Sequence, residues 1–382
     1  MDGETDMTKT IIKNSSKPYT PTTHRAGDIK KMLTGTETYL APLPLPTDAQ
    51  PYCPYISDFN DVYLDFGGGK PNVFSYQLNL GGPFTFSCLL AFGSPVVGGF
   101  LGLVLDYPRE DVADAVKGIF LAAWPLALAM WFFSTAICLY VWFQAHALYT
   151  KVIPTRFNRQ RREVCFTPHD SNEPLFVPWE ALSAWVVQSQ SATQYGVTRQ
   201  YGLGMGFEHE GELVSLEFQC GGLPLAIAHW EAVRCYMEYE LDDLKAIQDP
   251  LELQGPDDPS HEGLHTFRNA RTSMHRRWRE KEVGWVYAFF WYVYHVMTFW
   301  TLPNRLVEWE IKRIAKVGRR ALPQAIREWS KPLPPDHRAT PSHDLLRLSA
   351  NVRALQQRSP QRDITDIFAE VYRAEPDASD GG

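Results

Sequence analysis

Two long uncharged segments stand out in the hydrophobic pattern of the chain. No Asp, Glu, Lys or Arg lies between Pro71 and Leu105, and none lies between Gly118 and Thr150. A helix of about 20 apolar residues crosses a hydrocarbon core about 30 Å thick, so both segments are long enough. We therefore predict a transmembrane hairpin over residues 80–150, with spans at about 80–105 and 118–148. The alternative, a buried helix in a soluble core, accounts less well for two such segments in succession.

Basic residues at the ends of these spans predict their orientation. Five of them follow the second span directly: Lys151, Arg156, Arg159, Arg161 and Arg162. The connection over residues 106–117 holds two basic residues. Since basic residues favour the cytoplasmic side, we expect the connection outside and both flanks of the hairpin in the cytoplasm. The four arginines are then expected at the membrane surface, against anionic headgroups.

A third uncharged segment, Val283 to Asn304, is dominated by Trp, Tyr and Phe. Trp and Tyr favour the headgroup level of a membrane, because each combines an apolar ring with a polar group. Basic residues are equally frequent on both flanks, so they favour neither orientation. We expect a helix that lies in the membrane interface or packs on the hairpin. A third transmembrane span is the alternative.

Residues 152–247 show the period-two alternation of a small strand-rich domain. Within Glu212–Cys220, for example, Val214, Leu216 and Phe218 share one face. Pro224 then begins a helical pattern that runs to about Ile247. Antiparallel strands followed by one C-terminal helix predict a pleckstrin-homology-like β-barrel or sheet. The predicted fold class is therefore a membrane α-helical hairpin plus an α+β soluble domain.

The remaining segments are predicted from their polarity. Residues 1–70 are polar and contain many prolines, which predicts a loop with a short strand at Val62–Phe66. Residues 264–330 combine the aromatic segment with an amphipathic helix over Glu308–Trp329, and residues 331–382 form a helical tail. The basic face of the amphipathic helix carries Lys312, Arg313, Lys316, Arg319 and Arg320. Such a face predicts binding to an anionic leaflet, or else an ordinary solvated helix.

Charge and composition exclude several classes of protein. The formal net charge of −7 argues against a general nucleic-acid binder, so we expect no nucleic-acid partner. The mean hydropathy of −0.27 resembles that of a soluble protein, because the long polar segments outweigh the two spans in the mean. The chain has 6 cysteines and no CxxC pair, which excludes a disulfide scaffold and predicts free thiols in the cytoplasm.

Candidate catalytic chemistry is sparse. The chain lacks an HExxH motif, a GxSxG motif and the lysine motif of a phosphate-binding loop. His261 and His265 have the i, i+4 spacing of metal ligands on a helix, yet Pro259 and Gly263 beside them indicate a loop. The carboxylate of Asp65 has no visible partner in the sequence. We therefore expect no enzyme activity, no cofactor and no metal site.

Several motifs carry a resemblance to a known family, among them Asn60-Asp61-Val62-Tyr63-Leu64, Ala184-Trp185 and Leu302-Pro303-Asn304-Arg305. Phe157-Asn158-Arg159 directly follows the second span, and Pro178-Trp179-Glu180 lies in the strand-rich domain. With these motifs the chain resembles bacterial inner-membrane proteins that have two spans and a cytoplasmic strand-rich domain. The resemblance covers most of residues 60–310, and members of this family are often encoded near type VI secretion and effector genes. From its residues alone, the Phe157–Arg159 motif indicates a turn that joins the span to the first strand.

These observations together predict a non-enzymatic protein of the bacterial inner membrane. The hairpin anchors a cytoplasmic domain that binds a protein partner, and the resemblance implies that the partner is a toxin or a secretion component. The chain would then be an immunity protein or an accessory factor of type VI secretion. One alternative is a membrane-active antibacterial effector whose aromatic segment damages bilayers. Another is a lipid or signal sensor that binds headgroups through the basic helix.

Overall fold

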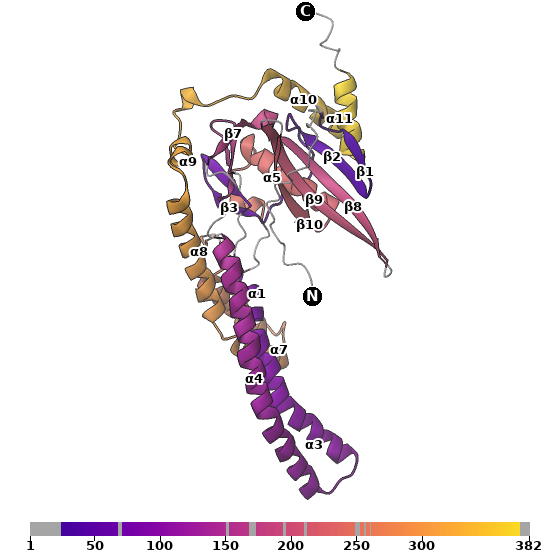
Figure 1. Cartoon of the computed structure of the whole chain (residues 1–382), viewed down its shortest axis with the longest axis vertical. Helices are drawn as coiled ribbons and strands as arrows, with labels where there is room; N and C mark the ends of the chain where they lie inside the picture. The colour runs from indigo at the N-terminus through magenta and orange to yellow at the C-terminus, as the bar shows by residue number, and fades with distance from the viewer. Residues whose placement is uncertain are drawn as a thin grey trace, which may run out of the picture. The chain divides into compact units, whose positions relative to one another are not determined.

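The computed structural model describes most of the chain, which forms two units (Figure 1). The described residues are 24–67, 71–149, 153–167, 173–193, 196–209, 212–248, 253–255, 257–259 and 261–374. Unit 1 combines Met1–Gly69, Ile153–Asp249 and Leu322–Gly382. Unit 2 combines Lys70–Val152 and Pro250–Ala321. Each unit is therefore built from stretches that lie far apart in the sequence.

Unit 1 contains two antiparallel sheets of five strands each. Sheet A has the order β1-β2-β8-β9-β10, with β1 (Ile29–Met32), β2 (Gly35–Ala41), β8 (Ser183–Thr193), β9 (Gly196–His209) and β10 (Glu212–Cys220). Sheet B has the order β3-β4-β5-β6-β7, with β3 (Ile56–Phe59), β4 (Tyr63–Phe66), β5 (Thr155–Asn158), β6 (Glu163–Phe166) and β7 (Leu175–Pro178). The α+β class is confirmed. The sheets are open rather than closed into a barrel, so the pleckstrin-homology-like plan is not confirmed.

The N-terminal region differs from the expected loop. Residues 29–66 contain β1 to β4, and several of their apolar side chains, such as those of Leu40 and Leu64, are fully buried. Strand β1 pairs with β2 and β3 pairs with β4, and each of these pairs is extended by a strand that comes much later in the chain, because β2 also pairs with β8 and β4 with β5. The prolines and threonines between the short strands concealed this pattern in the sequence. The short strand expected at Val62–Phe66 is confirmed as β4.

One helix of unit 1, α5 (Leu223–Met237), lies inside the core that both sheets share (Figure 1). Eleven of its 15 residues are buried, so the helix is covered on all sides. The predicted helix was longer, to about Ile247. It ends at Met237 because the chain turns away through Tyr239, whose φ of 57° lies in the left-handed region. A short 3₁₀ turn, η4 (Leu244–Ala246), follows.

The C-terminal helices complete unit 1. They are α9 (Gln324–Trp329), α10 (His343–Arg358) and α11 (Ile364–Arg373), with 3₁₀ turns η3 (Trp179–Ala181) and η5 (Pro335–His337) elsewhere in the unit. Leu345, Leu348 and Phe368 of α10 and α11 belong to the same core as the sheets. The C-terminal stretch is therefore an integral part of the folded unit, where the sequence indicated a tail.

Unit 2 is dominated by two apolar helices. The first, Val73–Val104, consists of α1 (Val73–Tyr76), η1 (Gln77–Gly81), α2 (Gly82–Cys88), η2 (Leu89–Gly93) and α3 (Ser94–Val104), where η1 and η2 are π-helical. The second is α4 (Arg109–Tyr149). Both helices are long and apolar enough to span a membrane. Each begins earlier than the sequence indicated, so the connection between them is shorter than expected.

Glycines of α3 allow the two apolar helices to approach closely. A Cβ atom added at Gly99 would lie 2.9 Å from Cγ2 of Val116, and one at Gly102 would lie 2.9 Å from Cγ2 of Val112. Small residues are frequent where helices pack inside membranes, because they bring the backbones together. Large apolar side chains on the other faces, such as Phe100 and Phe132, are exposed.

Three further helices belong to unit 2: α6 (Leu264–Arg279), α7 (Trp285–Met297) and α8 (Leu302–Ala321). The aromatic segment forms α7, which has 13 residues and is about 20 Å long, shorter than a hydrocarbon core of about 30 Å. The amphipathic helix is interrupted at Pro323 as its sequence indicates, because α8 ends at Ala321 and α9 begins at Gln324.

Candidate functional site

Arg156 is the first of the four arginines expected at the membrane surface. It lies on β5 directly opposite Asp65 of β4. Its Nε and Nη2 atoms donate hydrogen bonds of 2.6 and 2.7 Å to the two carboxylate oxygens of Asp65. Burial raises the pKa of Asp65 to about 6 although the hydrogen bonds from Arg156 oppose this shift. The carboxyl group is therefore ionised at neutral pH, and the two residues form a buried ion pair.

Arg159 follows in the turn after β5. Its Nη2 atom donates a hydrogen bond of 2.6 Å to Oδ1 of Asp61, and its Nη1 atom lies 3.3 Å from Oδ1 of Asp242. The guanidinium carbon is 4.9 and 4.6 Å from the ring centroids of Tyr236 and Tyr239. Contacts of this kind between a cation and aromatic rings are favourable, more so when they are shielded from water.

Arg162 occupies the other end of that turn. Its Nη1 and Nη2 atoms donate hydrogen bonds of 3.0 and 2.8 Å to the carboxylate of Glu238, and Nη2 donates a third of 3.1 Å to Glu180. The indole Nε1 of Trp179 donates to the same Glu238 carboxylate at 2.9 Å. Glu238 therefore joins two of the residues that the sequence singled out.

These contacts correct the expected position of the arginines. Arg156, Arg159 and Arg162 are only 5, 3 and 6% exposed, and each is paired with a carboxylate inside unit 1. A guanidinium held in this way is not available to a lipid phosphate. Arg161 is partly buried, and its Nε donates a hydrogen bond of 2.9 Å to the carbonyl of Trp329. The sequence interpretation failed because the acidic partners lie elsewhere in the chain.

The motif residues Phe157, Asn158 and Trp179 are fully buried. The Asn158 side chain accepts hydrogen bonds of 3.1 Å from the backbone N–H groups of Gln160 and Arg161, and its Nδ2 donates to the carbonyl of Trp329 at 3.0 Å. Asparagine favours turns because its side chain bonds the backbone two or three residues later. The motif therefore stabilises the turn between β5 and β6.

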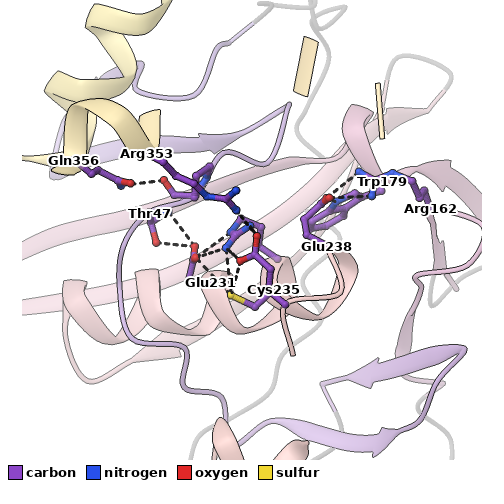
Figure 2. A network of polar contacts seen from close by, with 11 residues as sticks. Thr47, Arg162, Trp179, Glu231, Cys235, Glu238, Arg353 and Gln356 are labelled. Atoms are coloured by element: carbon purple, nitrogen blue, oxygen red, sulfur yellow. Dashed lines mark hydrogen bonds and ion pairs between the residues drawn. The ribbon is translucent and has the colours of Figure 1, made fainter. Parts of the chain in front are cut away.

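A second buried polar cluster lies on α5 (Figure 2). Nε and Nη2 of Arg234 donate hydrogen bonds of 3.0 and 2.6 Å to Oε1 of Glu231. The other carboxylate oxygen of Glu231 accepts hydrogen bonds from the backbone and hydroxyl of Thr47, at 3.1 and 2.8 Å. Arg234 also contacts Glu240, which pairs in turn with Arg353 of α10. The cluster thus joins α5 to the N-terminal and C-terminal stretches of unit 1.

The chemistry of this cluster favours a structural role. Burial raises the pKa of the Cys235 thiol to about 12, so the thiol is protonated at neutral pH and is a poor nucleophile. His229 is fully buried, its Nδ1 bonds the carbonyl of Tyr52 at 2.7 Å, and burial lowers its pKa. Arg234 and Arg353, the arginines of this cluster, both form ion pairs with carboxylates of the same unit. Their charges are therefore already neutralised and do not point to a substrate site. The contacts therefore position the elements of the fold.

Unit 2 has its own polar cluster, where α8 meets the open end of the hairpin. The Tyr76 hydroxyl of α1 donates to the carboxylate of the buried Glu310 of α8, and Trp142 Nε1 of α4 donates to the Tyr76 hydroxyl at 2.9 Å. Glu308 of α8 accepts a hydrogen bond of 2.8 Å from the backbone of Leu264, at the beginning of α6. These contacts fix α6 and α8 to the hairpin.

The predicted basic face of α8 is present in part. Lys312, Arg313 and Lys316 are exposed, and the Arg313 guanidinium lies 5.1 Å from the Trp309 ring centroid. The side chains of Arg319 and Arg320 lie outside the described part of the structure. The His261 and His265 rings lie with their centroids 5.9 Å apart and their planes inclined by 48°. Within the described residues no group of three or more His, Cys, Asp or Glu side chains is arranged to hold a metal ion.

The sequence interpretation missed the acidic partners, although one signal pointed to them. Asp65 lies between Leu64 and Phe66, and Glu231 lies between Trp230 and Ala232; all four apolar neighbours are fully buried. A carboxylate within such a run is rarely buried unless it is paired. That signal indicates that a partner exists without identifying it.

Comparison with known proteins finds no matching family model, no matching curated protein and no matching solved structure.

Proposed function

We propose that this chain is a non-enzymatic membrane protein in which a two-span hairpin holds unit 1 at the membrane as a protein-binding domain. The observation that carries the proposal is the pair of long apolar helices of unit 2. Their outward side chains are large, apolar and exposed, as in Phe100, Phe132 and Phe133. An exposed apolar surface of this extent costs free energy in water and is satisfied by lipid.

The connectivity of unit 1 supports an even number of crossings. Strand β4 precedes the hairpin and strand β5 follows it, yet the two pair directly. Both ends of a spanning hairpin must then lie on one side of the membrane. Helices α10 and α11 follow α7 and belong to the same core as the sheets, so a single crossing by α7 would separate them from the rest of unit 1. This connectivity favours two spans over three.

The proposed location is the bacterial inner membrane, with unit 1 in the cytoplasm and the connection between the spans outside. The buried ion pairs of unit 1 support a binding domain rather than an enzyme, because they fix the fold and present no activated nucleophile. The resemblance suggests the partner: a toxin or a component of type VI secretion, which makes the chain an immunity or accessory protein. Lys312, Arg313 and Lys316 of α8 are proposed to contact anionic headgroups.

Reporter fusions test the orientation. A reporter joined after Pro108 should be active only outside the cytoplasm, whereas reporters joined after Gly255 and after Gly382 should be active only inside it. A cytoplasmic signal at Pro108 would contradict the hairpin, and an external signal at Gly382 alone would establish a third span. Resistance of the full chain to alkaline carbonate extraction provides an independent test of membrane integration.

Expression tests the biological role against the alternative of a membrane-active effector, which the exposed aromatic side chains of α7 favour. An immunity or accessory protein should not slow the growth of cells that produce it. Growth arrest with loss of membrane potential would instead support the effector. A variant with p-benzoylphenylalanine at the exposed Phe176 of unit 1 identifies a protein partner by photocross-linking in the same cells.

A further inference from the structure

Helix α7 presents an entirely apolar face that no described residue covers. Six large side chains lie on this face, with exposures from 37 to 72%: Trp285, Val286, Phe289, Phe290, Val293 and Val296. The opposite face packs through the buried Ala288 and His295. A soluble helix of this kind would bring polar residues to its outer face. The exposed face of α7 therefore requires an apolar environment.

The neighbouring helix α6 supplies cations without partners. Arg268, Arg271 and Arg279 are exposed, and within the described residues they form no ion pair. Arg268 and Arg279 lie well away from the inward-packing Phe267 and Met274 around the helix, and Arg271 lies between these two sets. Arg156, Arg159 and Arg162 of unit 1 are neutralised by carboxylates, whereas these three exposed charges can be met by an anion outside the chain.

Direct contacts place α7 beside the apolar hairpin and α6 beside α7. Phe267 of α6 packs on Trp291 of α7, with ring centroids 5.9 Å apart. The Tyr294 hydroxyl of α7 donates a hydrogen bond of 2.9 Å to Gln77 of the first apolar helix. Just after α7, the Phe299 ring lies 5.1 Å from that of Phe84. These contacts fall roughly 6 to 17 Å along the helix from its beginning at Val73, near the level of lipid headgroups and upper acyl chains.

We propose that α6 and α7 form an in-plane membrane anchor. The apolar face of α7 embeds in the acyl-chain boundary of the leaflet at which the hairpin begins, and Arg268, Arg271 and Arg279 bind the phosphates of anionic lipids. The proposal rests on the membrane location proposed above. Two observations select lipid as the occupant: α7, with its exposed apolar face, contacts a hairpin whose own apolar side chains are exposed, and the arginine charge complements an anionic leaflet.

The length of α7 agrees with a helix parallel to the membrane. Its 13 residues are too few to cross the hydrocarbon core. The connectivity of unit 1 likewise excludes a single crossing between β10 and α10. Helix α7 has an apolar exposed face, lies beside the arginines of α6 and cannot cross the membrane. It therefore lies parallel to the membrane plane, at the interface. The hairpin then crosses the membrane, and α6 and α7 add a second contact with it that depends on the lipid headgroups.

Photocross-linking to lipid tests the proposal on the full chain in nanodiscs. p-Benzoylphenylalanine is placed at Phe290 on α7, at Phe100 on α3 as the span control, and at Phe176 on β7 as the control in unit 1. All three side chains are exposed, by 62, 64 and 40%. Lipid adducts at Phe290 and Phe100, and none at Phe176, are the expected result.

The controls separate this proposal from the one on which it rests. Lipid adducts at Phe100 without adducts at Phe290 would overturn the in-plane anchor and leave the hairpin in place. An absence of lipid adducts at both positions would overturn both. A protein adduct at Phe290, to a second copy or to another protein, would show that a protein covers this face and would also overturn the proposal.

A charge variant tests the arginines. Adduct yield at Phe290 is compared in nanodiscs of phosphatidylcholine alone and with about one-third phosphatidylglycerol; each arginine at an anionic surface contributes roughly fivefold in affinity at low salt. The yield should rise with phosphatidylglycerol, and R268Q/R271Q/R279Q should abolish the rise. The matched control K331Q/R347Q/R362Q removes the same charge from cations of unit 1 paired with Glu328, Asp344 and Glu370, and should retain it. Equal loss in both variants, or no dependence in the parent chain, would overturn the lipid role of these arginines.

Discussion

Arg156 and Asp65 form a bidentate ion pair between neighbouring strands. Asp65 lies on β4, which precedes the hairpin in the sequence, and Arg156 lies on β5, which follows it. Each residue is only 5% exposed. The pair therefore links the part of unit 1 that precedes the hairpin in the sequence to the part that follows it.

The first prediction concerns this pair. D65N leaves the Arg156 charge buried without its counter-charge, which should reduce the free energy of unfolding of unit 1 by about 3–5 kcal/mol. Maleimide labelling of the buried Cys53 and Cys165 during urea unfolding of the full chain measures the change. The control K331A removes an exposed ion pair with Glu328 and should cost less than about 1 kcal/mol. Equal effects from the two variants would refute a dominant role for the buried pair.

The second prediction concerns the close approach of Trp185 to β9. A Cβ atom added at Gly204 would lie 2.3 Å from the Trp185 indole, so G204V should destabilise unit 1 by about 1–3 kcal/mol. The double variant W185L/G204V should recover part of that loss, because the smaller side chain leaves room. G221A, whose added Cβ meets nothing nearer than 3.8 Å, is the matched control. The same thiol-labelling assay applies, and a double variant no more stable than G204V would exclude the steric explanation.

The third prediction concerns pH. Burial lowers the pKa of His229 below its ordinary value of 6.5, so the unfolded chain binds a proton that the folded chain does not. The stabilising contribution of the neutral imidazole is present above about pH 6.5 and declines as the pH falls below that value. The difference in unfolding free energy between the parent chain and H229Q should therefore shrink from about pH 7.5 to about pH 5.

Asp65 titrates in the opposite sense. Its folded pKa of about 6 exceeds the ordinary value of 3.8, so between these values the folded chain holds a proton that the unfolded chain has released. The stabilisation that this proton gives is lost as the pH rises from 3.8 to about 6. This contribution is common to the parent chain and H229Q, and it cancels in the difference. Tryptophan fluorescence during urea unfolding provides both free energies. A difference that stays constant with pH would show that His229 does not carry the effect.

The fourth prediction concerns the contact between α8 and the hairpin. Y76F removes the hydrogen bond to Glu310 and the one from Trp142, which should loosen α8 and raise the hydrogen-exchange rates of its backbone amides in nanodiscs. Y140F is the matched control, because the Tyr140 hydroxyl is exposed and bonds only within α4, to Gln144. If the exchange rates of the α8 amides are unchanged in Y76F, other contacts of α8 hold it to the hairpin, and the prediction is wrong.

The amino-acid sequence was sufficient for features that depend on local pattern. The two apolar helices, the strands β4 and β10, and the interruption at Pro323 all follow from hydrophobic runs, period-two alternation or a single backbone constraint. Features that depend on distant partners could not be predicted. Arg156 was placed at the membrane because Asp65 lies 91 residues away along the chain. The early strands were overlooked for the same reason, since β2 is completed only by β8.

The interleaved order of the two units has a consequence for how the protein is made. Strand β4 leaves the ribosome before the hairpin, and its partner β5 leaves after it. Sheet B therefore cannot close until α4 has been synthesised, and the core remains incomplete until α11 has emerged. Domains fold as units during synthesis, so under the membrane location proposed above the hairpin inserts before unit 1 folds. A chain that fails to insert, or that ends early, would leave strand edges unpaired and become a substrate for chaperones and proteases.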